Sequence, residues 1–373
     1  MHVFDILGIL KEHLFTLLSS MLFELDLIKI LVPSILTFLF GILITPLVAG
    51  YLYKHKMWKK KNVQVATDGR PAPITQQLHN DENMRVPRMG GIVMWGSVLL
   101  SSISIWLLAR IVPGSIVDKL EYINRTQTWL PFFAFFIGAI VGLVDDIYAV
   151  TDTYDQKAGG LSAKKRLTIV AIMGLVGGWW FFVKLGVGDV YIPFLGMWHI
   201  GWWIIPLFIA VMLGTYAGGV IDGIDGLSGG VFAVIFSAYG VIAFAQHQID
   251  LAAFCFVIVG GILAFLWFNI PPARFYLSDT GATALTMALG VVAFLSNQVV
   301  VLPIIAFPLV ATAGSSAIQL LSKKFRNGKK IFLVAPLHHH FQAIGWPAYK
   351  ITMRYWILSV MFGVAGIIIA LAG

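Results

Sequence analysis

Four groups of polar residues lie at the ends of long apolar segments in this chain. Hydrocarbon strongly disfavours carboxylates, so acids that are kept at such places indicate a function. In proteins Mg²⁺ takes one or two carboxylates together with phosphate and water oxygens. The sequence therefore predicts a shared Mg²⁺ and phosphate site built from Asp145 with Asp146, Asp222 with Asp225, Asn269 with Asp279, and His338–His340.

Asp145 and Asp146 end an apolar run that contains Gly138 and Gly142. Taken alone, an acidic pair at a helix end is more often solvated than catalytic, and that interpretation stays open here. Adjacent carboxylates repel each other, so they favour a cation or a proton between them. Because the preceding run is apolar, we expect the pair at or just inside the membrane interface.

Asp222 and Asp225 are three residues apart, a spacing that would put both on one face of a helix. The surrounding segment, residues 218–230, contains six glycines, whereas an ordinary tight turn needs one. Glycine-rich backbone can bring N–H groups close to a phosphate, as in anion-binding nests. We therefore favour a binding site over a simple turn, and the spacing does not match an EF-hand.

Asp279 and the histidines are ambiguous when each is taken alone. An acid in the first turn of a helix is ordinary dipole complementarity, so Asp279 by itself would mean little. His338, His339 and His340 could bind a metal, but consecutive side chains point in different directions, so at most two would converge. Phosphate binding or proton transfer is equally compatible with these residues. The hypothesis of one site therefore depends on all four groups facing the same side of a membrane.

The composition is that of an integral membrane protein. Hydrophobic residues make up 58% and charged residues only 12% of the 373 positions, and the mean hydropathy is +0.85. Soluble domains average about 25% charged residues. The single cysteine, Cys255, excludes a disulfide framework and a cysteine-built metal site. Nucleic-acid binding is not expected, because no soluble basic domain is present to do it.

The hydropathy pattern predicts an all-α polytopic fold with about ten transmembrane helices. A spanning helix needs about 20 apolar residues, and an open sheet cannot satisfy its backbone in lipid. Residues 1–26 mix acids with Leu and Phe and are expected to form an interfacial amphipathic segment, and residues 27–373 to form the transmembrane domain. The expected spans are residues 30–52, 90–112, 129–148, 166–186, 201–219, 226–246, 250–269, 281–297, 299–321 and 353–372.

The lysines and arginines orient these spans. Twenty of the 26 basic residues fall on alternate connections, which the positive-inside rule makes cytoplasmic. Both termini are then expected to face outward, and all four polar groups to face the cytoplasm. The net charge of +8 reflects this bias and attraction to anionic lipid. It could also help to hold a polyanionic substrate.

Short motifs around these residues resemble a known family. They are Arg85-Val86-Pro87-Arg88-Met89-Gly90-Gly91, Asp145-Asp146, Asp222-Gly223-Ile224-Asp225-Gly226, and Asn269 with Asp279-Thr280-Gly281. Together they are similar to the polyprenyl-phosphate N-acetylhexosamine-1-phosphate transferase superfamily, also called glycosyltransferase family 4. The resemblance runs from about residue 30 to the C-terminus, and a ten-span topology agrees with it.

A later segment is similar to one branch of that family, the phospho-N-acetylmuramoyl-pentapeptide transferases of peptidoglycan synthesis. It comprises residues 335–341 around the three histidines, Gly345-Trp346-Pro347 and Arg354-Tyr355-Trp356. The chain departs from the branch in three places. Val86-Pro87-Arg88 stands where its members have Thr-Pro-Thr, Gly219 replaces an asparagine, and Asn83 or Met84 stands where a lysine is expected. The Pro-Arg pair is closer to relatives that transfer simple sugars.

The resemblance implies a bacterial inner-membrane enzyme whose active site faces the cytoplasm. It would use Mg²⁺ to move phospho-N-acetylmuramoyl-pentapeptide from its UDP-linked sugar form to polyprenyl phosphate, releasing UMP. UDP-N-acetylglucosamine is the alternative donor. Direct attack, a covalent intermediate and a homodimer all stay open. The implied roles are catalytic for Asp145, Asp146, Asp222 and His338, substrate-binding for Asp225, Asn269, Tyr276 and His339, and metal-binding for Asp279.

Two other classes of function compete with the enzyme. A secondary transporter also places acids near helix breaks, but it holds them near the bilayer midplane and often has duplicated halves. Here the acids are expected at one interface, and no duplication is visible. A catalytically inactive scaffold is compatible with Gly219, whereas retention of all five aspartates argues against it.

Overall fold

The structure of the protein is a computed structural model that describes residues 3–58, 85–114, 116–124, 127–151 and 160–373. Some of the twenty basic residues on the connections expected to be cytoplasmic lie outside these ranges, namely Lys59, Lys60, Lys61, Arg70 and Lys157. Asn83 and Met84, which stand where the family has a lysine, also lie outside them.

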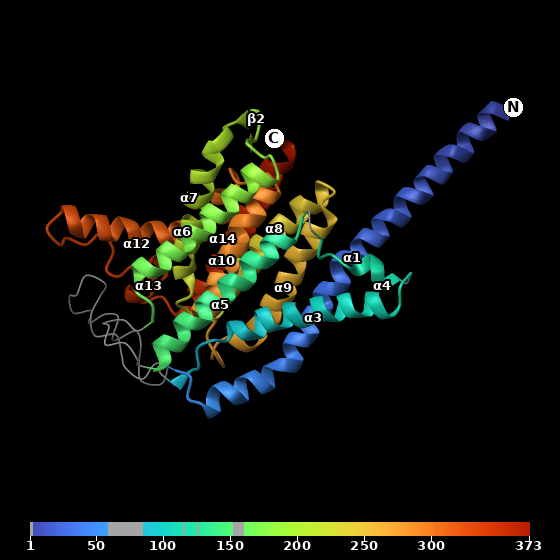
Figure 1. The fold of residues 1–373 in the computed structure, drawn as a ribbon. Coiled ribbons are helices and arrows are strands. Elements are labelled where there is room, and N and C mark those ends of the chain that lie inside the picture. Colours follow the sequence, from blue (N-terminus) through green and yellow to red (C-terminus); the bar gives the residue numbers. More distant parts are fainter. Residues whose placement is uncertain (1–2, 59–84, 115, 125–126, 152–159) are drawn as a thin grey trace.

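The described part of the chain is mainly helical, as the sequence predicts, with a single short hairpin as its only sheet (Figure 1). The first half contains α1 (Val3–Lys54), α3 (Gly91–Ile111), α4 (Ile116–Leu120), α5 (Trp129–Thr151) and α6 (Ala163–Trp179), which continues into a π-helical turn, η2 (Trp180–Lys184). The second half contains η3 (Gly201–Trp203), α7 (Ile204–Gly218), η4 (Gly219–Ile221), α8 (Leu227–Ala245), α9 (Ile249–Asn269), α10 (Ser278–Leu295), α11 (Leu302–Ile305), α12 (Phe307–Phe325), α13 (Leu337–Ala343) and α14 (Ala348–Ala372).

Nine helices within the described ranges are long and apolar enough to cross a membrane, which confirms the polytopic all-α class. The expected span over residues 299–321 is not among them. The chain breaks at Ala306 between α11 and α12, and each of these helices has a proline in its first turn. Proline lacks a backbone N–H and favours a helix start, so one continuous helix does not form. The longer of the two helices, α12, also buries the polar side chains of Ser315, Gln319 and Ser322.

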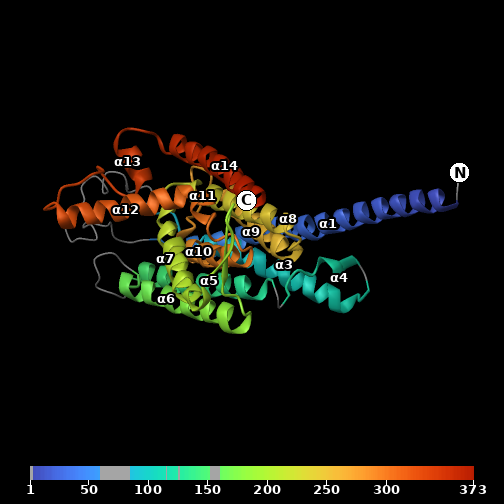
Figure 2. The same ribbon diagram turned by 90° about the horizontal axis from the view of Figure 1, so that it is seen from above.

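Residues 299–321, although divided between α11 and α12, still connect the two ends of the bundle. Before it, Asn297 Oδ1 accepts a hydrogen bond of 3.3 Å from the backbone N–H of Tyr191, in a hairpin formed by β1 (Asp189–Ile192) and β2 (Gly196–His199). After it, His338 packs against Gly223, which precedes the start of α8. The return is therefore made by α11 and α12, and α12 leans out from the bundle (Figures 1 and 2).

The N-terminal segment is not separated from the first span by a break. Helix α1 is continuous from Val3 to Lys54, and its beginning projects away from the bundle in both views (Figures 1 and 2). A 52-residue helix is about 78 Å long at 1.5 Å per residue, far more than a bilayer core requires. The location of residues 1–26 at the membrane interface stays a prediction.

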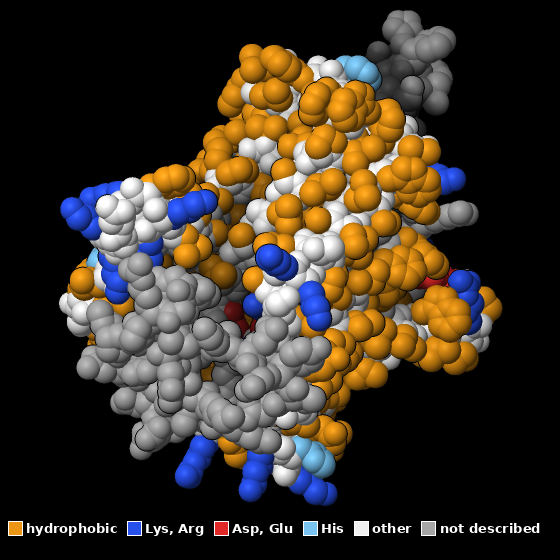
Figure 3. Space-filling view, turned by 60° about the vertical axis from the view of Figure 1, so that its left-hand side comes forward, with side chains coloured by type: hydrophobic (Ala, Val, Ile, Leu, Met, Phe, Trp, Pro, Cys, Tyr) orange, Lys and Arg blue, Asp and Glu red, His pale blue; other side chains and the backbone are white. Residues whose placement is uncertain are grey.

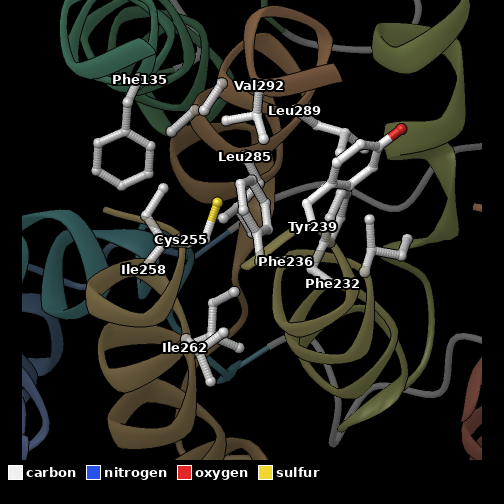
Figure 4. Close-up of a cluster of buried hydrophobic side chains, with 14 of the residues drawn as sticks. Phe135, Phe232, Phe236, Tyr239, Cys255, Ile258, Ile262, Leu285, Leu289 and Val292 are labelled. Carbon is white, nitrogen blue, oxygen red and sulfur yellow. The ribbon is translucent and has the colours of Figure 1, made fainter. Parts of the chain in front are cut away.

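Helix α10 lies at the centre of the bundle and packs against α3, α5, α7 and α8. Its residues are buried on all sides, whereas α1 and α14 carry many exposed apolar side chains, as lipid-facing helices do. Figure 4 shows the core where α5, α8, α9 and α10 meet. The side chains labelled there are Phe135, Phe232, Phe236, Tyr239, Cys255, Ile258, Ile262, Leu285, Leu289 and Val292.

Candidate active site

Glycines let three helices approach closely at the end of the bundle where Asp145 and Asp146 lie. A Cβ on Gly142 would lie 2.0 Å from the carbonyl oxygen of Asp279, so α5 touches the start of α10 directly. A Cβ on Gly91, at the start of α3, would lie 2.4 Å from the backbone nitrogen of Gly281. Only glycine permits such contact. The acids that end α5 are thereby placed beside Asp279.

Asp146 is completely buried, and both of its oxygens accept hydrogen bonds from the protein. Oδ2 accepts from the backbone N–H and the hydroxyl of Thr280, at 2.9 Å and 2.6 Å. Oδ1 lies 2.9 Å from both Nε and Nη2 of Arg88. A buried carboxylate is stable only when it is paired and hydrogen-bonded in this way. Asp146 therefore holds Arg88 and the first turn of α10 in place.

Asp145 makes a similar set of contacts with a different segment. Its Oδ2 lies 3.2 Å from Nη1 of Arg166, in the first turn of α6. The backbone N–H of Leu161 donates to its Oδ1. Gly160 has φ +82°, and a Cβ there would lie 2.8 Å from that same oxygen, so glycine is required for this approach. The pair predicted to hold a cation is thus met by two guanidinium groups.

Asp279 is the most accessible of the three carboxylates and the least tightly held. Its side chain is 31% exposed, against 4% for Asp145 and 0% for Asp146. Oδ2 lies 3.3 Å from Nη2 of Arg88, and Oδ1 lies 3.7 Å from Nη1 of Arg166. The structure therefore gathers Asp145, Asp146 and Asp279 into one cluster, as the sequence predicts. We call these three acids with Arg88 and Arg166 the ionic cluster.

Asp222 adjoins the ionic cluster through the start of α10. Its Oδ2 accepts a 2.8 Å hydrogen bond from the backbone N–H of Ser278, the residue before Asp279. Its Oδ1 accepts a 2.6 Å bond from the hydroxyl of Ser228. Burial raises the pKa of Asp222, although these two hydrogen bonds and the charge of Arg88 oppose the shift.

The prediction that Asp222 and Asp225 share one helix face is wrong. They lie in turns between η4 and α8, because the helical backbone ends at Asp222 (φ −74°, ψ 74°) and α8 begins only at Leu227. Asp225 Oδ2 instead accepts a 3.0 Å hydrogen bond from the backbone N–H of Ala273, and burial raises its pKa. Within the protein, the two acids therefore hold different segments.

Asn269 ties this turn to the loop that precedes α10. Its Oδ1 accepts from the backbone N–H of Gly226 at 2.9 Å, and its Nδ2 donates to the carbonyl of Phe275 at 2.8 Å. The side chain is buried. These two bonds fix the loop that carries Tyr276, so the amide serves the architecture of the site.

Tyr276 connects the same loop to the segment of Arg88. Its backbone N–H donates to the carbonyl of Pro87 at 2.9 Å, and its carbonyl accepts from Gly90 at 2.8 Å. Burial, followed by the charges of Asp225 and Asp222, raises the pKa of its phenol to about 12. Tyr276 is therefore a neutral ring beside the two aspartates.

Two of the three histidines converge on the Asp222–Asp225 turn, in agreement with the expectation that at most two would do so. A Cβ on Gly223 would lie 2.4 Å from Nε2 of His338 and 2.9 Å from Nε2 of His339, and the two rings are 4.3 Å apart. His338 is fully buried, and within the described ranges neither ring nitrogen has a hydrogen-bond partner. Burial lowers the pKa of His338, and the neighbouring His339 lowers it further. His340 turns away and accepts a 3.3 Å hydrogen bond from the backbone N–H of Leu333.

Sequence reasoning missed the partners of the acids. Arg88 was noted only as a departure from a family motif, and Arg166 only as a topology charge. Ser228 and Ser278 were not singled out, and Thr280 was named only as part of the Asp279-Thr280-Gly281 motif. A partial signal existed for the arginines, because both lie in connections expected on the same face as the acids, and buried acids need cationic partners.

The donors present fit a weakly held Mg²⁺ rather than a protein cage. Across the described ranges, no three His, Cys, Asp or Glu side chains converge as a metal site would need. Mg²⁺ does not require such a cage when phosphate oxygens complete its shell. Asp279, exposed and loosely paired, fits the single carboxylate that such an ion would take.

The chain is similar in sequence to a family model and to several named relatives. Residues 128–297 match the family model described as glycosyl transferase family 4. A phospho-N-acetylmuramoyl-pentapeptide-transferase of Chloroflexus aurantiacus is 30% identical over 341 residues, which cover 88% of this chain and 87% of the relative. Those of Levilactobacillus brevis and Listeria welshimeri are 30% and 31% identical, covering 79% and 78% of this chain and 87% and 86% of the relatives. The chain therefore belongs to the phospho-N-acetylmuramoyl-pentapeptide-transferase family of glycosyl transferase family 4 enzymes.

Proposed function

We propose that this protein transfers phospho-N-acetylmuramoyl-pentapeptide from its UDP-linked form to polyprenyl phosphate, releasing UMP and forming lipid I for peptidoglycan synthesis. The relatives are named for transfer of this group. The observation that carries the proposal is the ionic cluster, in which three carboxylates and two guanidinium groups meet beside the start of α10. Such an arrangement suits phosphoryl transfer.

The reaction exchanges one phosphoanhydride for another. An oxygen of the lipid phosphate attacks the β-phosphorus of the UDP-sugar, the bond to the UMP oxygen breaks, and UMP leaves. Little acid–base chemistry is needed, so the protein acts mainly by positioning the groups and stabilising charge. A Mg²⁺ held by Asp279 would neutralise charge that develops on the diphosphate.

The contacts of the ionic cluster divide the roles within it. Asp146 uses both oxygens inside the protein, so it positions Arg88 and Thr280. Asp145 shares Arg166 with Asp279, and we assign it to orienting the lipid phosphate.

The turn that holds Asp222 and Asp225 is assigned to the nucleotide. The Asp225 carboxylate could accept the uracil N–H, and the neutral ring of Tyr276 could stack on the base. His338 and His339 lie against the same turn and would contact the diphosphate or the sugar. Asn269 supports these groups through Gly226 and Phe275.

We further propose that the site faces the cytoplasm of a bacterial inner membrane, with both termini outside. Lys164 and Lys165 begin the helix that carries Arg166. Lys323 and Lys324 end α12, which returns the chain to the histidines. Figure 3 shows acidic side chains recessed in a hollow, with Lys and Arg side chains around it. A cluster of Lys and Arg residues at one end of the helix bundle fits the cytoplasmic side of the membrane.

The alternative donor, UDP-N-acetylglucosamine, is favoured by one observation. Arg88, which belongs to the segment that resembles simple-sugar relatives, is a central member of the ionic cluster. The histidine segment and the relatives favour the muramoyl-pentapeptide. A pocket built for the larger donor should reject the smaller one, because its polar groups would be left unpaired.

The test uses purified full-length protein with Mg²⁺ and polyprenyl phosphate, and UMP release is measured for each donor. We expect turnover with UDP-N-acetylmuramoyl-pentapeptide, and loss of it in Asp279→Asn, which removes a charge without changing shape. Asp189→Asn, in the hairpin at the other end of the bundle, is the matched control and should stay active. Turnover of UDP-N-acetylglucosamine alone would reject the assigned donor, and no UMP release from either would reject the proposed reaction.

A further inference from the structure

Arg88 and Arg166 contact the cluster in the same unequal way. Each guanidinium has one close carboxylate, at 2.9 Å for Arg88 with Asp146 and 3.2 Å for Arg166 with Asp145. Each also reaches Asp279, at the longer distances of 3.3 Å and 3.7 Å. The two arginines approach different oxygens of Asp279. Asp279 is therefore shared by two cations, and neither is anchored there.

The anchoring carboxylates are themselves held rigidly. Thr280 donates two hydrogen bonds to Asp146, and Leu161 donates one to Asp145. Each guanidinium can thus give up its contact with Asp279 and still remain in the site. Arginine carries five N–H donors in a planar fork that matches phosphate oxygens.

The charges leave room for one cation. Two arginines oppose three carboxylates, which leaves the ionised cluster with a net charge of −1. A divalent cation changes this to +1, which favours a diphosphate. However, Arg88 and Arg166 already lie against the two oxygens of Asp279 that a cation would need. Like charges so close together compete for the same carboxylate.

We propose that Arg88 and Arg166 are phosphate-binding residues that exchange partners: they occupy Asp279 in the ligand-free protein and donate to the diphosphate when a divalent cation takes that carboxylate. This inference rests on the proposed function, because the diphosphate and the cation are part of it. Asp146 and Asp145 keep their arginines throughout, so the exchange needs only a small rotation of each guanidinium group. The sequence difference at Arg88 is then part of the binding chemistry of this chain.

A purely structural role for Arg88 predicts something different. If Arg88 only neutralised buried Asp146, its removal would disturb the site, and cation binding would weaken with everything else. If Arg88 instead competes with the cation for Asp279, its removal should strengthen cation binding while diphosphate binding weakens. Arg88→Met should bind a divalent cation roughly tenfold more tightly, since a like charge is removed from beside Asp279. The same variant should bind a diphosphate about tenfold more weakly, because charge-assisted hydrogen bonds are lost.

The experiment measures binding without turnover. Mn²⁺ is titrated into purified full-length protein in detergent, and the free ion is followed by electron paramagnetic resonance. UDP is then titrated at saturating Mn²⁺ by calorimetry. Arg88→Lys keeps the charge, so its Mn²⁺ affinity should stay near that of the wild type while UDP binding weakens, because lysine lacks the fork. Arg85→Met removes an exposed arginine three residues away and is the matched control.

Tighter Mn²⁺ binding together with weaker UDP binding in Arg88→Met supports the exchange. Unchanged or weaker Mn²⁺ binding in that variant overturns it, as does a wild-type protein that binds no Mn²⁺. If Arg88→Met does not fold, Arg166→Met carries the same two expectations. Protein that shows the exchange but transfers no sugar would reject only the proposed function, because neither titration depends on turnover.

Discussion

Replacing Gly142 by alanine should separate α5 from α10 and disable the site without altering any of its polar side chains. The added Cβ would lie 2.0 Å from the carbonyl oxygen and 2.4 Å from the carbonyl carbon of Asp279, whereas real Cβ contacts essentially never fall under 3.0 Å. The obstructing atoms are backbone, so no side chain can rotate away. The helices must therefore part by about 1 Å, and overpacking of this kind costs about 1–3 kcal/mol of folding free energy.

That movement is large enough to break the contacts between the two helices. The 2.9 Å hydrogen bond from the Thr280 N–H to Asp146 would lengthen to about 3.9 Å, beyond hydrogen-bonding range. Asp279 would shift by the same amount relative to Asp145. A misplacement of about 1 Å in a catalytic arrangement can cost on the order of 100-fold in rate. We expect a loss of that size in UMP release.

The assay compares Gly142→Ala with Gly214→Ala under the same conditions. Gly214 is also helical and lies in a membrane span, and a Cβ there would meet nothing within 4 Å. Gly214→Ala should keep the wild-type rate and melting temperature. Near-normal UMP release by Gly142→Ala, at an unchanged melting temperature, would show that the approach of α5 to α10 does not position the acids.

Three further outcomes follow from single residues. The pKa of His338 lies below its ordinary value of 6.5 in the folded protein, so below pH 6.5 the unfolded chain binds more protons and stability should fall as the pH drops. The melting temperature of His338→Gln should fall less than that of the wild type over the same pH range. An equal fall in both proteins would contradict this explanation. Ser278 has φ +58°, so Ser278→Gly should raise stability by about 1 kcal/mol in thermal unfolding while it keeps the backbone bond to Asp222; a lower melting temperature would rule out strain there. A cysteine label should react with Asn327→Cys only after the inner face of the membrane is exposed. The same label should react with Met197→Cys, in the hairpin, from outside intact cells. Labelling of Asn327→Cys from outside would reverse the proposed orientation.

The sequence was sufficient for the class, the helices and the gathering of the acids. Hydropathy is a local property, so spans could be counted from runs of apolar residues, and loop charges then placed Asp145, Asp222 and Asp279 at one end. The exception shows the limit of that approach. Residues 299–321 are apolar enough to suggest one span, but the prolines in the first turns of α11 and α12 divide the segment.

The tertiary structure alone decided how the polar residues pair. Arg88 is 58 positions from Asp146 and 191 from Asp279, and it meets both because Gly91 and Gly142 let α3 and α5 touch α10. The end of the helical backbone at Asp222 likewise keeps Asp222 and Asp225 off one helix face, although their spacing suggested a shared one. Spacing along the chain predicts neighbours only within one helix. Contacts between helices depend on how closely their backbones approach, which the packing of the whole bundle determines.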